Sequence, residues 1–130
     1  MLDEARTLGQ RPEAYAFVRE VHLMCDDEPW VFARTVIPAA TLKGGRRRLA
    51  NLGKRPLGAV LFADRSMRRS PVEVARLCPG QPLFIRAVAP LESAPAAIWG
   101  RRSVFRLSGA PLLVSEIFLP GIGISYSNER

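Results

Sequence analysis

Apolar and polar residues alternate with a period of two along several stretches, which is typical of strands buried on one face. Residues 14–37 are rich in aromatic and β-branched residues on both sides of the turn sequence Asp26-Asp27-Glu28-Pro29. Residues 99–119 repeat this arrangement around Ser108-Gly109-Ala110-Pro111. The pattern therefore predicts two β-hairpins, one in each half of the chain.

The residues between the hairpins predict shorter elements. A helix is expected over Arg46–Leu52, with Gly53 as its C-terminal stop, and a second helix is expected over Leu57–Phe62. A strand is expected over Val72–Leu77, whereas Leu83–Ala89 fits a helix or a strand equally well. Together these elements predict an α+β fold, a mostly antiparallel sheet with a few short helices on it.

Length and composition indicate one folded domain over residues 1–130, in which residues 1–13 form a mobile lead-in. The chain has 130 residues, of which 48% are apolar and 24% are charged, as in ordinary globular domains. Its formal net charge is +7, and only Lys43 and Lys54 among its basic residues are lysines. Arginine favours planar recognition of anions, so nucleic acid, a membrane surface and small carboxylates or phosphates all fit this composition.

Several classes of chemistry fit poorly. There is one histidine, His22, and no Cys-x-x-Cys pair, so we expect no metal site and no nucleophilic triad. Gly44-Gly45 lacks the Gly-Lys-Ser/Thr sequence of a phosphate-binding loop. The cysteines Cys25 and Cys78 are too few for a disulfide framework, and we expect no signal peptide and no membrane span, which favours the cytoplasm.

Two charged residues fall on otherwise apolar strand faces. Arg19 alternates with Phe17 and Val21 in the first hairpin, and Glu116 alternates with Val114 and Phe118 in the last strand. Burying a charge is costly unless it is paired or meets a ligand. Arg19 and Glu116 therefore neutralise each other, extend to the edge of the sheet, or bind a ligand that is anionic at one end and hydroxylic at the other. Arg34, which lies in a strand next to apolar residues, is a second candidate for an anion.

The arginine clusters have a plainer interpretation. Arg46-Arg47-Arg48 and Arg68-Arg69 fit solvated helix and loop faces, and Arg101-Arg102 fits either the surface or the mouth of a pocket. A nucleic-acid surface would interleave aromatic residues with the basic ones. The strand aromatics have apolar neighbours instead and are expected in the core; they are Phe17, Trp30, Phe32, Trp99, Phe105 and Phe118. An anion- or RNA-binding basic domain is therefore the weakest of the functional interpretations.

Six blocks of sequence, in this order, resemble the chorismate lyase (chorismate–pyruvate lyase) family. The blocks are Val18–Val21, Asp27–Trp30, Ala33–Pro38, Leu52–Gly58, Trp99–Ser103 and Leu107–Pro120. Each block is unspecific alone, but the set is specific and spans most of residues 14–120. The resemblance implies an antiparallel sheet whose small helices close over an internal ligand cavity.

The resemblance also implies an activity. The family converts chorismate to 4-hydroxybenzoate and pyruvate, the entry to ubiquinone, without a metal or an organic cofactor. Its ligand-binding arginine falls on Arg19, its glutamate on Glu116 and a main-chain contact of its pocket on Leu57. Chorismate is a dianion, so Arg19 would hold the ring carboxylate and Arg34 the other, while Glu116 orients the C4 hydroxyl or transfers a proton.

The chain departs from the family pattern at two places. The helical segment that supplies a methionine contact ahead of the first matched strand is expected to be missing, and the stretch 79–97 is longer than in compact members. A domain of the same fold that binds a small aromatic acid without catalysis, as in some helix-turn-helix regulators, is therefore the alternative function. For either function we expect a monomer that binds a small molecule, and neither nucleic acid nor a membrane.

Overall fold

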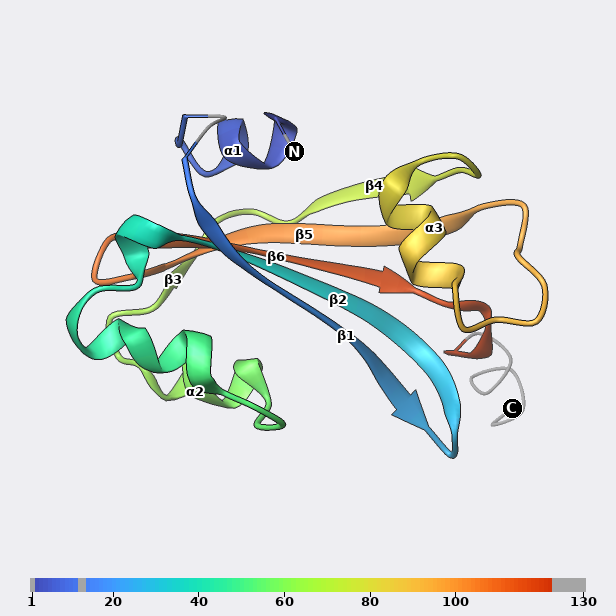
Figure 1. Ribbon diagram of the computed structural model, residues 1–130, viewed down its shortest axis with the longest axis horizontal. Coiled ribbons are helices and arrows are strands. Elements are labelled where there is room, and N and C mark those ends of the chain that lie inside the picture. Colours follow the sequence, from blue (N-terminus) through green and yellow to red (C-terminus); the bar gives the residue numbers. More distant parts are fainter. Residues whose placement is uncertain (1, 12–13, 123–130) are drawn as a thin grey trace. The chain divides into compact units, whose positions relative to one another are not determined.

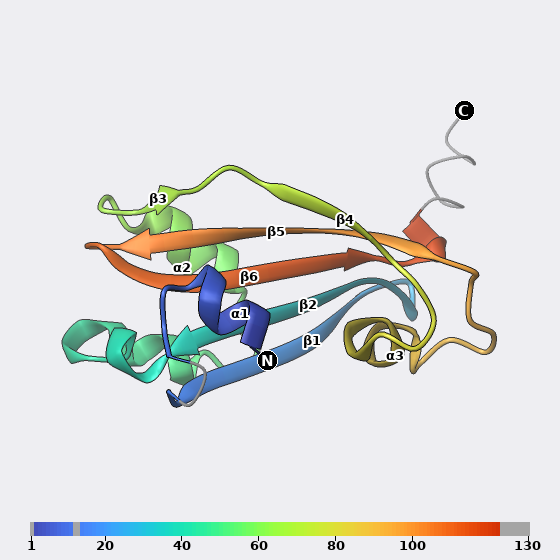
Figure 2. The same ribbon diagram turned by 90° about the horizontal axis from the view of Figure 1, so that it is seen from above.

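The computed structural model describes residues 2–11 and 14–122 as a β-sheet with short helices. In chain order the elements are α1 (Leu2–Thr7), β1 (Ala16–Cys25), β2 (Glu28–Pro38), the 3₁₀-helices η1 (Ala39–Thr41) and η2 (Gly44–Asn51), α2 (Leu57–Ala63), β3 (Arg68–Arg69), β4 (Glu73–Leu77), α3 (Pro82–Val88), β5 (Ile98–Leu107) and β6 (Ala110–Phe118). The sheet has the order β1-β2-β6-β5-β3, and β4 also pairs with β5, antiparallel to it (Figure 2). The expected antiparallel α+β fold is confirmed.

Both predicted hairpins are present, but their turns are shorter than the four residues expected. Asp26 and Asp27 have φ values of 50° and 65°, and Ser108 and Gly109 have φ values of 51° and 83°. Two consecutive residues with positive φ are typical of the two-residue type I′ turn, whose twist matches that of the flanking strands. The remaining residues of the expected turns, including Pro111, belong to the strands.

The chain divides into two compact units. Unit 1 comprises residues 1–19, 35–71 and 103–114, and unit 2 comprises residues 20–34, 72–102 and 115–130. Strands β1, β2, β5 and β6 each contribute residues to both units.

Unit 1 has helices on both faces of its strands. Leucines of η2 and α2, among them Leu49 and Leu61, pack against Ile37 and Leu112 on one face. Leu8, which directly follows α1, is buried with Val36, Val104 and Leu113 on the opposite face. Figure 1 accordingly shows α1 and α2 on opposite sides of these strands. The lead-in expected over residues 1–13 thus contains a helix, because Leu8 anchors that segment in the core.

Unit 2 has its own core beneath α3. The stretch that fitted helix or strand is helical from Pro82 to Val88, and Phe84 and Ala87 pack against Phe32, Ile98 and Ile117. The nitrogen Nε2 of His22 lies 3.0 Å from the carbonyl oxygen of Ala87, which fixes the helix to β1. Trp99 is not in the core as expected: it alternates with Ile98 along β5 and is 56% exposed.

Candidate ligand-binding site

Arg19 lies on the more buried face of β1, as the alternation predicted. Phe17, two residues earlier on the same face, packs against the core of unit 1. The Nη2 atom of Arg19 donates hydrogen bonds to the carbonyl oxygens of Gly53 and Arg55, both at 3.2 Å. Its Nε and Nη1 groups have no partner among the described residues, so both remain as hydrogen-bond donors for a ligand carboxylate.

The carbonyls that Arg19 binds belong to the loop that leads into α2. Gly53 follows η2 with a φ of +60°, the left-handed conformation that glycine adopts without a steric penalty. This turn redirects the chain toward Pro56, which has a helix-compatible φ of −65°, and Leu57 then begins α2 as a buried residue. Arg19 is therefore attached to the segment that carries Leu57, and both belong to unit 1.

Glu116 is paired with an arginine on the neighbouring strand. Its side chain is 28% exposed, and its Oε1 accepts a hydrogen bond of 3.0 Å from Nε of Arg101. The guanidinium carbon of Arg101 also lies 5.5 Å from the centroid of the Phe118 ring. Because Ile117 packs beneath α3, the adjacent Glu116 faces the opposite side of the sheet in unit 2. The ion pair that the sequence left open for Glu116 is thus made with Arg101.

The sequence contained a signal for this pair that its interpretation missed. With a two-residue turn at Ser108-Gly109, Arg101 and Glu116 are each the seventh residue from the turn. Residues equally distant from such a turn face each other across the hairpin. The longer turn expected from Ser108-Gly109-Ala110-Pro111 hid this register, and Arg101 was left between a surface role and a pocket role.

Gly100 brings the backbone of β5 close to that of β6 beside Glu116. A Cβ atom at residue 100 would lie 2.6 Å from Cδ1 of Ile117 and 3.1 Å from the carbonyl oxygen of Glu116. Both distances are shorter than ordinary van der Waals contacts. A glycine at this position therefore allows the close strand approach that sets the position of Glu116.

Arg34 is buried and already faces a carboxylate. Its Nη1 lies 2.6 Å from Oε2 of Glu20, and its side chain is 8% exposed. The same oxygen of Glu20 accepts a longer hydrogen bond of 3.2 Å from Arg86 on α3. Glu20 thus occupies the position next to Arg34 where the sequence placed a ligand carboxylate.

The four predicted residues are divided between the two units. Arg19 and Leu57 lie in unit 1, whereas Glu116 and Arg34 lie in unit 2, where each has a different partner. The described residues contain no group of three or more His, Cys, Asp or Glu side chains that could hold a metal ion. Within the same part of the chain, every helix is too short or too polar to cross a membrane.

Comparison with known proteins gives related sequences over nearly the whole chain. A protein of Nitrosomonas europaea is 41% identical to this chain over 121 residues. The matched region covers 93% of this chain and 68% of the relative. Relatives from Thiobacillus denitrificans and Azoarcus sp. are 46% and 48% identical over 92% of this chain, which covers 64% and 66% of their lengths. All three carry the name "Probable chorismate pyruvate-lyase". The chain thus spans about two thirds of the length of these relatives.

Solved structures share the fold at low sequence identity. A GntR-family transcriptional regulator from Enterococcus faecalis matches 93% of this chain with a TM-score of 0.62 and 19% identity, over 86% of that chain. A second structure, from Bordetella bronchiseptica, is described as "the ligand-binding domain of a putative GntR-family transcriptional regulator". It matches 92% of this chain and 78% of its own chain, with a TM-score of 0.62 and 15% identity.

The sequence model described as "Chorismate lyase" matches residues 1–129, nearly the full length of the chain. This match agrees with the relatives and with the six sequence blocks from Val18 to Pro120. The chain belongs to the chorismate lyase family.

Proposed function

We propose that this protein is a chorismate–pyruvate lyase that converts chorismate to 4-hydroxybenzoate and pyruvate, the first step of ubiquinone biosynthesis, in the cytoplasm. The observation that carries the proposal is the 41–48% identity, over more than nine tenths of the chain, to the three relatives named above. By the family resemblance, the ligand-binding arginine and glutamate fall on Arg19 and Glu116, and we adopt this assignment in the proposal.

The proposed reaction is an elimination in which atoms and charges balance without an oxidant. The ether bond at ring C3 breaks, and its electron pair leaves with the enolpyruvyl oxygen. The hydrogen at C4 leaves as a proton, the ring becomes aromatic with its hydroxyl retained, and the enolpyruvate takes up a proton on its methylene carbon to become pyruvate. Because aromatisation drives the reaction, the protein supplies mainly orientation and stabilisation of charge.

Arg19 is the proposed anchor for the ring carboxylate. Its Nη2 donates to the carbonyls of Gly53 and Arg55, which orients the planar group and leaves Nε and Nη1 as the donors for a ligand carboxylate. The carbonyl contacts also attach the guanidinium to the segment that begins α2. In this proposal the main chain at Leu57 supplies a further contact to the ligand, as the family resemblance implies.

Glu116 is the proposed partner of the C4 hydroxyl, and Arg101 holds it in place. The 3.0 Å hydrogen bond to Arg101 restricts the rotation of the carboxylate. The carboxylate of Glu116 can accept a hydrogen bond from the hydroxyl, and it is also suited to receive the C4 proton. For the second carboxylate, the proposal assigns Arg34, which would then share its guanidinium with Glu20.

The direct test is incubation of the purified chain with chorismate, with 4-hydroxybenzoate and pyruvate measured over time. Equimolar formation of both products, above that in a reaction without protein, is the expected result. The Arg76→Gln variant is the matched control, because Arg76 is exposed on β4 and belongs to no candidate site. Absence of pyruvate while the protein stays folded would overturn the proposed activity.

The alternative is a domain that binds a small aromatic acid without catalysis. It is favoured by the likeness to GntR-family regulators, one of them described as a ligand-binding domain. Saturable binding of 4-hydroxybenzoate by calorimetry, together with no turnover of chorismate, would support this function over the lyase. We give precedence to the lyase because the sequence identity to the lyase relatives is more than twice that to the regulators.

A further inference from the structure

The excess positive charge of the protein is concentrated in residues 43–69, which we call the basic segment. It contains nine of the 19 basic residues and only one acid, Asp64. The other 103 residues contain ten bases and eleven acids and are therefore close to neutral. The whole segment belongs to unit 1.

The basic segment packs on the strands through its leucines and exposes its bases. Leu49, Leu52, Leu57 and Leu61 are buried in the core of unit 1. All nine bases except Arg46 are exposed. The side chains of Arg47, Lys54 and Arg65 make no hydrogen bond or ion pair with any described residue. The layer is thus apolar toward the sheet and cationic on its outer side.

The exposed side of α2 adds apolar surface amid these charges. The helix has the sequence Leu-Gly-Ala-Val-Leu-Phe-Ala, without a polar side chain, and Gly58, Ala59, Phe62 and Ala63 are exposed. Phe62 is 67% exposed, and its ring lies edge-on to that of Phe105, with the ring centroids 6.5 Å apart. Arg55 precedes α2 in the sequence and Arg65 follows it, so the exposed apolar residues of this helix lie between two bases.

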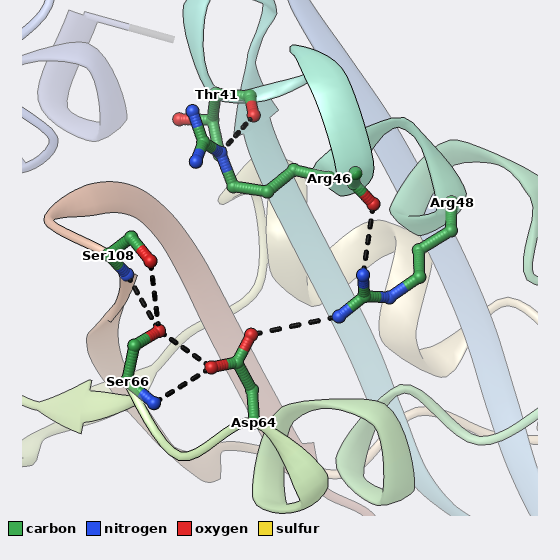
Figure 3. Close-up of polar contacts among 7 residues, drawn as sticks. Thr41, Arg46, Arg48, Asp64, Ser66 and Ser108 are labelled. Atoms are coloured by element: carbon green, nitrogen blue, oxygen red, sulfur yellow. Dashed lines mark hydrogen bonds and ion pairs between the residues drawn. The ribbon is translucent and has the colours of Figure 1, made fainter.

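The one acid of the segment stabilises its shape and pairs with Arg48, which leaves the other exposed bases without an acidic partner from the segment. Figure 3 shows Asp64 accepting hydrogen bonds from the backbone and hydroxyl of Ser66, with Arg48 at 3.6 Å on its other oxygen. Arg46, in turn, donates to the carbonyl of Thr41 at 2.7 Å. These contacts join η2, the end of α2 and the turn after it, so the outer bases are presented on an ordered layer.

We propose that the outer side of the basic segment binds the surface of an anionic lipid membrane, with Phe62 inserted among the lipid headgroups. Basic residues around exposed apolar side chains match the two attractions of such a surface, to phosphate charge and to the interfacial apolar layer. A second copy of the chain fits poorly, because two strongly positive layers repel each other. Nucleic acid fits less well, because α2 has a single exposed aromatic and no polar side chain with which to contact a base.

This inference does not depend on the proposed lyase activity, and it departs from the expectation of no membrane partner. That expectation treated the arginine clusters as solvated faces, because the sequence alone did not place the apolar side of α2 outward. Exposed bases alone would remain solvated. In the basic segment, the exposed Phe62 adds an apolar side chain to these bases.

The test is co-sedimentation of the 130-residue chain with unilamellar vesicles of phosphatidylcholine, with and without 30% phosphatidylglycerol as a chosen anionic fraction. Binding is expected only to the anionic vesicles, and it should weaken as salt is added. The double variant Arg47→Gln/Arg65→Gln should bind about tenfold or more weakly. Its control, Arg11→Gln/Arg76→Gln, removes two exposed bases outside the segment and should bind like the parent.

The apolar contribution is tested by Phe62→Ser, which should weaken vesicle binding several-fold, whereas Tyr15→Ser, at another exposed aromatic, should not. Melting curves of all variants establish that they are folded. No binding to anionic vesicles would overturn the proposal, as would equal losses in the two double variants. Binding that is unaffected by Phe62→Ser and is displaced by RNA would replace the membrane with nucleic acid as the partner.

Discussion

Arg101 and Glu116 face each other across the β5–β6 hairpin, with Nε of the arginine 3.0 Å from Oε1 of the glutamate. The pair is partly exposed, with 44% of the arginine side chain and 28% of the glutamate side chain accessible. At this exposure an ion pair contributes little to folding, typically less than about 1 kcal/mol. Its main effect is to hold the carboxylate in one orientation, which allows stability and turnover to be separated by mutation.

We expect Glu116→Gln to lower kcat for chorismate by about 10²–10⁴, because the amide cannot accept a proton. The free energy of unfolding should change by less than about 1 kcal/mol. The control is Arg101→Gln, which breaks the same ion pair but leaves the carboxylate in place. Steady-state kinetics and urea denaturation measure the two effects. A Glu116→Gln variant with full activity and reduced stability would show that the pair is only structural.

Arg19→Lys should weaken binding of 4-hydroxybenzoate by about 1–3 kcal/mol, because an ammonium lacks the planar set of donors that contacts Gly53 and Arg55 and still leaves Nε and Nη1 for a carboxylate. Calorimetry measures the affinity. Arg47→Lys serves as the control, since that guanidinium is exposed and has no described partner. Unchanged affinity in Arg19→Ala would move the carboxylate site elsewhere, with Arg34 as the next candidate.

Glu20→Gln should destabilise the fold by about 1–3 kcal/mol, because it removes the carboxylate that faces the buried Arg34. Arg86→Gln removes the more exposed half of the same cluster and should cost less than about 1 kcal/mol. Urea denaturation of both variants gives the comparison. Equal losses would show that the burial of Arg34 does not set the cost.

Stability should depend on pH through Asp64. Hydrogen bonds from the hydroxyl and backbone of Ser66, and the nearby Arg48, hold the pKa of this carboxyl below its ordinary value of 3.8. A lowered pKa in the folded state adds stability above the unfolded pKa, and that stability is lost as the pH falls through the folded pKa. The stability gap between the parent and Asp64→Asn should therefore be largest near neutral pH and shrink in acid. A gap that is independent of pH would contradict this assignment.

Gly100→Ala should destabilise the protein by about 1–3 kcal/mol, because the added methyl group would press on Ile117 and on the backbone of Glu116. Gly58→Ala is the matched control: nothing lies within 4 Å of the added atom, and a helical alanine should stabilise by about 0.5–1 kcal/mol. Thermal unfolding distinguishes the two. If Gly100→Ala also lowers kcat, the strand spacing at Glu116 matters for the proposed reaction.

The hairpins and the two off-pattern charges could be predicted from the sequence because both depend on local alternation. Period-two counting placed Arg19 correctly on the more buried face of β1. It also predicted an apolar face with Glu116, although the other face of β6, with Leu113 and Ile117, is the more deeply buried one. Both faces of β6 are largely apolar because the strand is central in the sheet, and the alternation alone did not rank them by burial.

Partners in distant parts of the chain could not be predicted in this way. The contact of Glu20 with Arg86 joins residues 66 positions apart, and that of Arg19 with Arg55 joins residues 36 apart. No local pattern specifies such pairs, because they depend on how helices and loops pack on the sheet. The strand pattern indicated Arg34 as a partner for an anion but gave no sign that Glu20 lies next to it.

The two-residue turn of the second hairpin cannot take up an inserted residue without a change in strand register, which limits where insertions can occur in this protein. One residue inserted between Leu107 and Ala110 would shift β6 by one position against β5 and bring Ser115 or Ile117 opposite Arg101 in place of Glu116. The stretch between β4 and β5 has no such constraint, since extra residues there can bulge into solvent without changing the strand register. Insertions and deletions that preserve the Arg101–Glu116 pair should therefore accumulate before β5 and be absent from the turn at Ser108-Gly109.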